Sequence, residues 1–180
     1  MHGRLFVFSR LYGMFIKLTA SLPTMVTDTV PAIRVMSAAD IERVSAIECA
    51  CSASPWSRKQ FEHSLDDAKG LSIVLLADGE IIGFAVLSTV LDEAELHNIA
   101  VDPSRQGSGF GAYMLDYLLT NLPAEIKTTY LEVRVSNFRA IRLYQQRGFV
   151  QVGERRDYYK TELGREDGLL MSRQTDTDPT

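Results

Sequence analysis

Apolar residues recur at two spacings between residues 33 and 173, and these spacings predict a domain built of both strands and helices. Alternating or short unbroken apolar runs indicate strands, whereas apolar residues three and four apart indicate helices. We expect helices at residues 38–47, 57–65, 109–122 and 138–147, and strands at residues 33–35, 71–77, 81–90, 95–101, 128–133, 149–154 and 168–173. This order of elements predicts an α/β domain with a mixed sheet.

Turn and cap residues support several of these boundaries. Ser37 and Ser57 each precede an apolar stripe, and serine is a preferred helix N-cap. Asp78-Gly79 lies between two apolar runs, which is the signal of a two-residue hairpin turn. Gly148 follows the last predicted helix and is expected to end it.

The first thirty residues lack this periodicity. Arg10 and Lys17 interrupt their apolar residues, whereas a secretory signal peptide needs an unbroken apolar run of about 7–15 residues. No stretch reaches the ~20 apolar residues of a membrane span. We expect residues 1–30 to be an N-terminal extension, either an amphipathic targeting peptide or the product of an early start codon. Residues 31–173 then form the folded domain, and residues 174–180 a disordered tail.

Composition and charge exclude several classes of function. With 46% hydrophobic and 23% charged residues, the chain can bury a core of ordinary size and remain soluble. A net charge of −4 disfavours a dedicated nucleic-acid-binding protein, which would show a basic excess. Cys49 and Cys51 are too few for a disulfide framework or a zinc site, so we expect reduced thiols, no metal and a cytoplasmic location.

A glycine-rich loop before the helix at 109–122 is the strongest functional signal. It follows the apolar strand that ends in Ile99-Ala100-Val101, and it runs Gln106-Gly107-Ser108-Gly109-Phe110-Gly111-Ala112. Backbone N–H groups without side chains at a helix start bind phosphate well. We therefore expect a cofactor of the nucleotide type, held by its phosphates.

Three kinds of glycine loop compete for this segment. A P-loop needs a lysine after its last glycine, and none is present. A dinucleotide-binding fingerprint fits Gly107, Gly109 and Ala112, with Glu132 about twenty residues later, but its glycines should follow the strand directly. Here residues 102–106 intervene. The third kind, Q-x-x-G-x-G, fits Gln106, Gly109 and Gly111.

With this third loop, the chain resembles the GNAT N-acetyltransferases over residues 33–171, most of all the bacterial enzymes that acetylate the N-terminal alanine of a small-subunit ribosomal protein. The further matches are Pro55-Trp56-Ser57, residues 90–94 and 98–103, Leu131-Glu132-Val133-Arg134, Ser136-Asn137, Tyr144, Gly148-Phe149, Tyr158-Tyr159 and residues 164–167. The resemblance implies the acyl-CoA N-acyltransferase fold, a mixed and mostly antiparallel sheet flanked by helices. It also implies acetyl-CoA as co-substrate, without a metal.

The resemblance assigns the reacting groups. It implies that Glu132, a lone carboxylate in an apolar strand, is the general base, and that Tyr144 is the general acid for the leaving thiolate. Tyr144 follows Asn137 by seven residues on the same helix face, so Asn137 could reach the pantetheine arm. We expect activity to fall at high pH with the pKa of a phenol, ~10. Structural roles for Glu132 and Tyr144, as a solvated carboxylate and a core tyrosine, remain open.

The substrate is implied to be the N-terminal peptide of a ribosomal protein, whose amine attacks directly. Tyr158 and Tyr159 are expected in a loop that closes over this peptide, and Trp56 is expected to be either a packing anchor or a wall of the substrate groove. A lysine side chain or a small-molecule amine is the alternative acceptor, and a non-catalytic acyl-CoA-binding module is the alternative class. We expect a monomer that binds neither nucleic acid nor membrane.

The loop departs from the family pattern at two positions. GNAT enzymes usually carry arginine or another long polar residue at the second loop position, and often one after the last glycine. This chain has Gly107 and Ala112 there. Backbone amides can still bind phosphate, but two charge-assisted contacts are missing.

Overall fold

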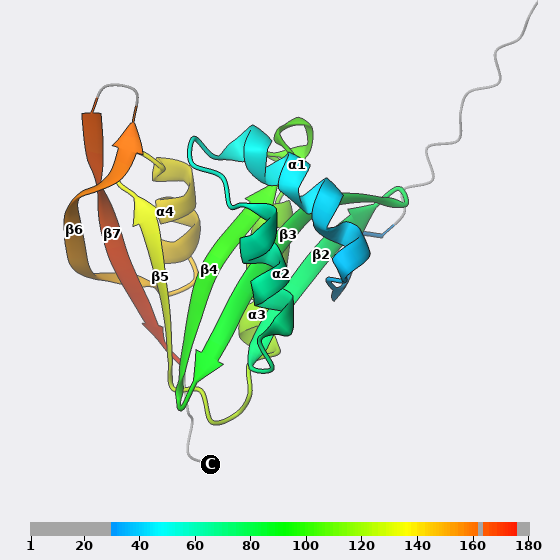
Figure 1. The fold of residues 1–180 in the computed structure, drawn as a ribbon. Helices are drawn as coiled ribbons and strands as arrows, with labels where there is room; N and C mark the ends of the chain where they lie inside the picture. The colour runs from blue at the N-terminus through cyan, green and yellow to red at the C-terminus, as the bar shows by residue number, and fades with distance from the viewer. Residues whose placement is uncertain (1–29, 162–163, 176–180) are drawn as a thin grey trace, which may run out of the picture.

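A seven-stranded sheet with helices on both faces organises residues 30–161 and 164–175, which the computed structural model describes (Figure 1). The strand order is β1-β2-β3-β4-β5-β7-β6. The strands are β1 (Ala32–Val35), β2 (Gly70–Ala77), β3 (Glu80–Val90), β4 (Glu93–Val101), β5 (Thr128–Arg134), β6 (Val150–Thr161) and β7 (Gly164–Gln174). The α-helices are α1 (Ile41–Cys51), α2 (Arg58–Asp66), α3 (Phe110–Thr120) and α4 (Phe138–Gln145), and short 3₁₀ turns η1 (Ala38–Asp40) and η2 (Pro103–Arg105) precede α1 and α3.

The predicted mixed sheet is confirmed, because β4 and β5 pair in parallel while every other pair of neighbouring strands is antiparallel. The predicted strands and helices are all present, with ends that differ by at most four residues except at β6, which ends at Thr161 instead of the predicted residue 154. β7 extends to Gln174, which pairs with Thr128, one residue into the segment predicted as a tail. Residues 176–180 of that tail and residues 1–29 of the predicted extension lie outside the described residues. In the described part, no helix is long and apolar enough to cross a bilayer.

One prediction about the last strands is wrong. Tyr158 and Tyr159 lie within β6 rather than in a loop, because β6 and β7 continue as a hairpin to Thr161 and Gly164. The register between β6 and β7 shifts between Arg155 and Tyr159, which leaves Arg156, Asp157 and Tyr158 out of the regular ladder. An irregularity of this kind removes the alternation by which a strand is recognised in sequence.

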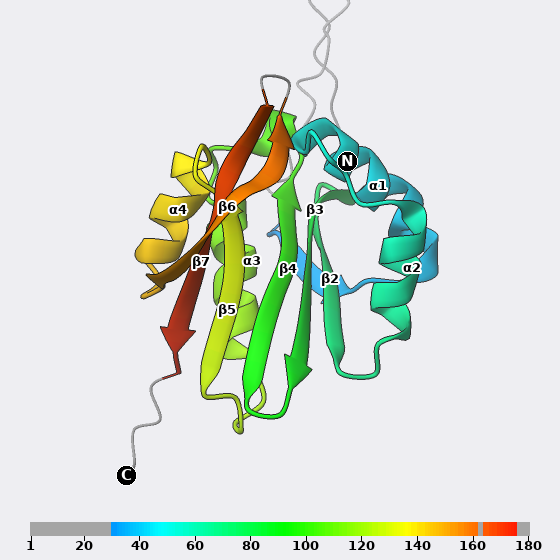
Figure 2. The same cartoon turned by 60° about the vertical axis from the view of Figure 1, so that its left-hand side comes forward.

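Two apolar cores lie on opposite faces of the sheet. The first lies under α3 and α4, and the second lies between α1, α2 and the β2–β4 half of the sheet (Figures 1 and 2). The first includes Leu96, Met114, Leu115, Leu118, Leu131, Val133 and Tyr144, and the second includes Ile41, Val44, Ile47, Phe61, Val74 and Phe84. The β5–β7–β6 half of the sheet therefore lacks a helical cover on the α1/α2 side (Figure 2).

The sheet splits between β4 and β5. Their pairing runs from Glu93↔Thr128 to Leu96↔Leu131 and then stops, while β4 stays paired with β3 up to Val101. The register between β3 and β4 shifts at this point, so that His97 is an extra residue in β4. Such a bulge bends its strand, and the two strands diverge as a V in Figure 1.

Asp102 fixes the chain where β4 ends and the glycine loop begins. Its Oδ1 accepts hydrogen bonds from Ser104 N at 2.9 Å and Ser104 Oγ at 2.6 Å, and its Oδ2 accepts one from Arg43 Nη2 at 2.6 Å. These hydrogen bonds, from Ser104 first and then Arg43, lower the pKa of Asp102 to about 2. Arg43 belongs to α1 and also donates to Ile81 O at 3.0 Å, so one carboxylate ties a helix, a hairpin and the loop together.

Replacing Asp102 with alanine should destabilise the fold by about 1–2 kcal/mol, because a cap and a partly buried ion pair are lost. The folded-state pKa is about 2 and the unfolded value is ~3.9, so the carboxylate stabilises the fold above pH ~4 and this contribution disappears as pH falls through ~2. Melting temperatures measured from pH 6 downward should therefore converge for the wild type and Asp102→Ala.

Asp116→Ala is the control, since it removes a solvent-exposed ion pair with Arg147 and should change stability by less than about 1 kcal/mol. A difference between wild type and Asp102→Ala that stays constant down to pH 2.5 would show that the carboxylate charge is not what matters.

Candidate active site

The glycine loop forms an open N-terminus for α3. Gly107 and Gly109 have φ values of +92° and +85°, which side-chain-bearing residues rarely adopt. A Cβ built on Gly109 would meet no atom within 4 Å, so the space in front of the helix is open. Ser108 is exposed there, and α3 begins at Phe110, whose ring packs on the first core. Free N–H groups at this end suit an anion such as phosphate.

The other predicted loop residues differ in role. A Cβ on Gly111 would lie 3.8 Å from Leu143 Cδ2 and 4.0 Å from Val101 Cγ2, so this glycine is in ordinary contact with its neighbours and has no positive φ. Ala112 follows in the first turn of α3. The Gln106 side chain turns inward, and its Nε2 donates to Val101 O at 3.0 Å. Gln106 thus holds the loop against the end of β4.

Cys51, distant in sequence from the loop, is close to it in space. Its Sγ donates to Val101 O at 3.3 Å and accepts from Gln106 Nε2 at 3.8 Å. Desolvation, with the nearby carboxylates of Glu48 and Asp102, raises the pKa of the Cys51 thiol. A protonated thiol is a poor nucleophile, so its proximity does not favour an acyl-enzyme.

One edge of β4 is open along the split. From Asn98 to Val101, β4 pairs with β3 only, and no other described strand covers its second edge. Ile99 and Val101 turn their side chains to the first core and Ala100 turns its methyl to the second. What remains for a ligand is their backbone, which an extended chain with amide groups can join as another strand would.

Glu132 lies on the uncovered face of β5, on the opposite side from Leu131 and Val133. Its Oε2 is 3.1 Å from Arg155 Nη1, and its side chain is 17% exposed. A Cβ on Gly168 would be 3.3 Å from Glu132 Oε1 and 3.1 Å from Tyr159 Cε2. The missing side chain at Gly168 therefore lets the carboxylate and the tyrosine ring lie together.

Tyr159 and Tyr158 extend this cluster along β6. Desolvation, followed by its hydrogen bond with Glu132, raises the pKa of Tyr159. Its ring lies 4.2 Å from the Arg134 guanidinium carbon and meets the Tyr158 ring edge-on at 5.0 Å. Arg134 is held in turn by Glu166 at 2.8 Å. Tyr159 is thus fixed beside Glu132 by Arg134 and by the Tyr158 ring, and the Arg155 guanidinium carbon lies 4.9 Å from the centre of the Tyr158 ring.

Tyr144 belongs to the opposite side of β5. It is buried in the first core and its ring lies 5.9 Å from that of Phe149. Burial raises the pKa of Tyr144, so the phenol stays protonated beyond the alkaline limit near 10 that the sequence led us to expect. Glu132 and Tyr144 do not touch. They flank β5 from its two faces, next to the split in the sheet.

Two further predicted residues have local structural roles. Asn137 is the N-cap of α4, and its Oδ1 accepts from Ala140 N at 3.1 Å. The Trp56 ring packs on that of Phe61 with centroids 5.4 Å apart, and the backbone N–H of Trp56 donates to Glu48 Oε1 at 3.1 Å. Trp56 thus packs between α1 and α2, and its place in a substrate groove stays a prediction.

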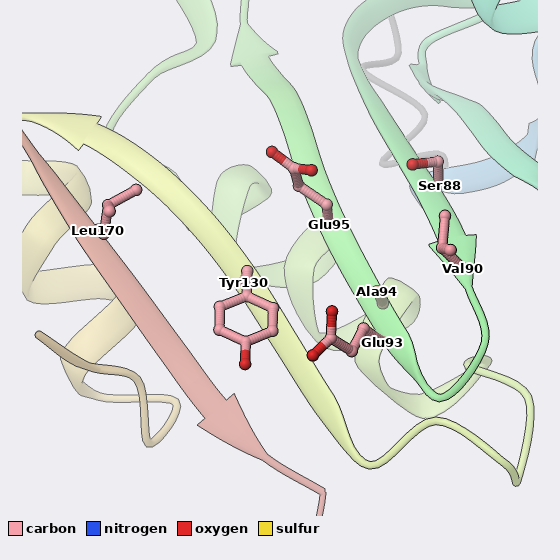
Figure 3. Close-up of a pocket in the computed structure, with 7 residues that line it drawn as sticks. All are labelled: Ser88, Val90, Glu93, Ala94, Glu95, Tyr130 and Leu170. Carbon is pink, nitrogen blue, oxygen red and sulfur yellow. The ribbon is translucent and has the colours of Figure 1, made fainter. Parts of the chain in front are cut away.

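A pocket of about 430 Å³ lies on the uncovered face (Figure 3), and its lining includes Leu170, the residue of β7 that pairs with Glu132. Glu93 and Glu95 from β4 line it beside Tyr130, which precedes Glu132 by two residues on β5. His97 lies next to it, with Nε2 at 2.7 Å from Ser88 Oγ. The two carboxylates make this approach to Glu132 acidic, which suits a cationic amine.

Sequence reasoning missed the residues that surround Glu132. Arg155 and Gly168 become its neighbours only through the β5–β7–β6 register. Arg155 stands in a run of polar residues without alternation, so no local signal marks it. Gly168 was assigned only to the start of a strand. A glycine within a strand signals close approach of another group, and this signal was available.

Comparisons with known proteins agree with this geometry. The Acetyltransferase (GNAT) family model matches residues 41–149. The [ribosomal protein bS18]-alanine N-acetyltransferase of Salmonella typhimurium is 40% identical over 141 residues, 78% of this chain and 95% of that protein. Its Escherichia coli K12 counterpart is 41% identical over 134 residues, 74% and 90% of the two chains. The crystal structure of the ribosomal-protein-S18-alanine N-acetyltransferase from Escherichia coli superposes with a TM-score of 0.77 and 38% identity, covering 81% of this chain and 94% of that one.

The family match spans α1 to α4, the strands β2 to β5 and the glycine loop, and the Salmonella typhimurium relative aligns with 78% of the chain. The chain therefore belongs to the GNAT acetyltransferase family, and within it is similar to the ribosomal-protein alanine N-acetyltransferases.

Proposed function

We propose that this enzyme transfers the acetyl group of acetyl-CoA to the N-terminal alanine of a small-subunit ribosomal protein, by direct attack of the α-amine. The relatives at 40–41% identity carry the name of this activity, with bS18 as its substrate. Acting on a ribosomal protein, the enzyme would work in the cytoplasm, and we propose residues 31–173 as its catalytic unit.

The observation that carries the proposal is the split between β4 and β5, with an open strand edge leading to the glycine loop. An added Cβ on Gly109 would enter empty space, so the loop can accept a pyrophosphate there. The backbone of residues 99–101 would hold the pantetheine arm in strand-like fashion, directing the thioester into the split.

Acetyl-CoA supplies the acetyl group as a thioester, and the thiolate leaves. Glu132 takes a proton from the attacking amine on the uncovered face, where the acidic pocket favours arrival of the ammonium form. Tyr144 gives its proton to the departing sulfur from the opposite side of β5. A C–N bond forms and the C–S bond breaks. The ammonium group loses two protons in all: Glu132 keeps one, and the other replaces the proton that Tyr144 gives to the thiolate. Tyr158 and Tyr159 would line the path of the peptide beside Glu132.

Short peptides that differ in their first residue test the acceptor. We expect a peptide with N-terminal alanine to be acetylated fastest with acetyl-CoA, as measured by release of free CoA and by mass spectrometry. The same peptide with its α-amine blocked and a lysine inside is the control for side-chain acetylation. Faster reaction of that control, or of a polyamine, would replace the proposed acceptor by a lysine or a small-molecule amine.

Glu132→Gln should lower kcat by about 10²–10⁴-fold, because the general base is lost while the cofactor loop is unchanged. The KM for acetyl-CoA should stay near its wild-type value. The deficit should shrink as pH rises through ~8, where more of the peptide amine is already neutral.

Glu166→Gln is a matched control, since Glu166 also pairs with an arginine on the same sheet and its side chain is equally exposed, 17%. It should keep most of the wild-type kcat. Equal losses of kcat in the two variants would mean that Glu132 acts only by holding the sheet together.

Tyr144→Phe should lower kcat by about 10²-fold and leave CoA affinity and melting temperature unchanged, because the ring keeps its packing and only the proton donor is removed. Since burial raises the pKa of Tyr144, the loss should be constant up to pH 10 and no alkaline limb should change. Rates measured from pH 6 to 10 check this.

Tyr117→Phe serves for comparison, because Tyr117 packs on the same core from α3 and has no proposed catalytic role. If Tyr144→Phe has the same kcat as the wild type, Tyr144 serves only to pack the core. Tyr159 would then be the next candidate for the proton donor.

A further inference from the structure

Arg139 places an unpaired cation beside the glycine loop. It is the second residue of α4, it is exposed, and its Nη2 lies 3.8 Å from where a Cβ on Gly107 would be. Within residues 30–161 and 164–175, its guanidinium has no carboxylate or hydrogen-bond partner, whereas Arg134, Arg147 and Arg155 each pair with a carboxylate. The glycine loop beside it is suited to an anion.

Helix stability does not explain this arginine. The first turn of a helix carries a partial positive charge, so a cation there is unfavourable and an acidic residue is preferred. α4 has no acidic residue in its first turn, and Asn137 caps it through an uncharged amide. A residue that opposes its local structure without a compensating contact is a candidate for function.

Gly107 and Arg139 are complementary. The family pattern has a long polar side chain at the position of Gly107, and often another at that of Ala112, and this chain has neither. The φ of +92° at Gly107 disfavours any such side chain, and the absence of a Cβ leaves room for the guanidinium to approach from α4. A cation that the loop lacks is therefore present on α4, as Arg139.

We propose that Arg139 binds a phosphate of acetyl-CoA and so replaces, from α4, the charged contacts that the loop lacks. This inference rests on the proposed function. Guanidinium and phosphate match as a two-pronged, charge-assisted pair. The phosphates are then held between the N-terminus of α3 and the first turn of α4, in a protein whose net charge of −4 otherwise repels a polyanion.

The dissociation constant for CoA, measured by calorimetry on the full chain, tests this contact. Arg139→Ala should bind CoA about 10-fold more weakly, the effect of one charge-assisted phosphate pair. The affinity of Arg139→Lys for CoA should lie between those of the wild type and Arg139→Ala, because the lysine ammonium keeps the charge but lacks the planar, two-pronged geometry of a guanidinium. The loss should shrink at high salt, where exposed charges are screened.

Lys59→Ala is the matched control. Lys59 is also an exposed second residue of a helix, α2, and its loss changes the net charge equally. It should bind CoA like the wild type. The melting temperature of Arg139→Ala should be unchanged or slightly higher, because an unfavourable cation leaves the start of a helix.

A second titration with 3′-dephospho-CoA identifies the phosphate. If Arg139→Ala weakens the binding of 3′-dephospho-CoA as much as that of CoA, the contact is to the pyrophosphate. If the variant and the wild type bind 3′-dephospho-CoA equally, the contact is to the 3′-phosphate. With acetyl-CoA at saturation, Arg139→Ala should retain the wild-type kcat and show only a raised KM.

Binding of CoA to folded Arg139→Ala as tightly as to Lys59→Ala would overturn the inference. A wild-type protein that binds no CoA would instead overturn the proposed function, and the same experiment separates the two results.

Discussion

The pairing between β4 and β5 ends after Leu96 and Leu131, and the candidate site depends on this constraint. Beyond it, each strand is held only by its outer neighbour, β3 or β7, so the sheet can separate without losing its cores. His97, the extra residue of β4, bends the strand away at the same point. The opening lies at the carboxyl ends of two parallel strands, where α/β sheets commonly receive ligands.

The two helical layers cover different parts of the sheet around this opening. α3 and α4 pack on the face that carries Tyr144 and the glycine loop, whereas α1 and α2 cover only the β2–β4 half of the other face and leave Glu132 accessible. Arg43 joins the layers, since it reaches from α1 to Ile81 O and to the Asp102 carboxylate that fixes the loop. Donor and acceptor can therefore arrive from different sides of one sheet and meet at its split.

Sequence patterns were sufficient where a signal is local. Asp78-Gly79 marks its hairpin, the glycines mark the start of α3, and regular apolar spacing marks the helices. Sequence patterns failed where pairing depends on distant strands. Because the register is irregular at residues 155–159, the sequence shows no alternation there, and the strand that contains Tyr158 and Tyr159 was not predicted. The neighbours of Glu132 and the approach of Arg139 to Gly107 come from tertiary packing. The roles proposed for Glu132 and Tyr144 rest on the family resemblance, because spacing alone cannot assign them.

The open edge of β4 would also make the stability of the fold depend on the concentration of acetyl-CoA. The backbone N–H and C=O groups of a strand within a sheet normally bond to neighbouring strands of the same chain. Here the proposed co-substrate would bond to those of residues 97–101 instead. A ligand that binds only the native state stabilises it by mass action, by about 2.7 kcal/mol at a hundred times its dissociation constant. The folded fraction of this enzyme, and hence its resistance to proteolysis, would then rise and fall with the supply of acetyl-CoA in the cell.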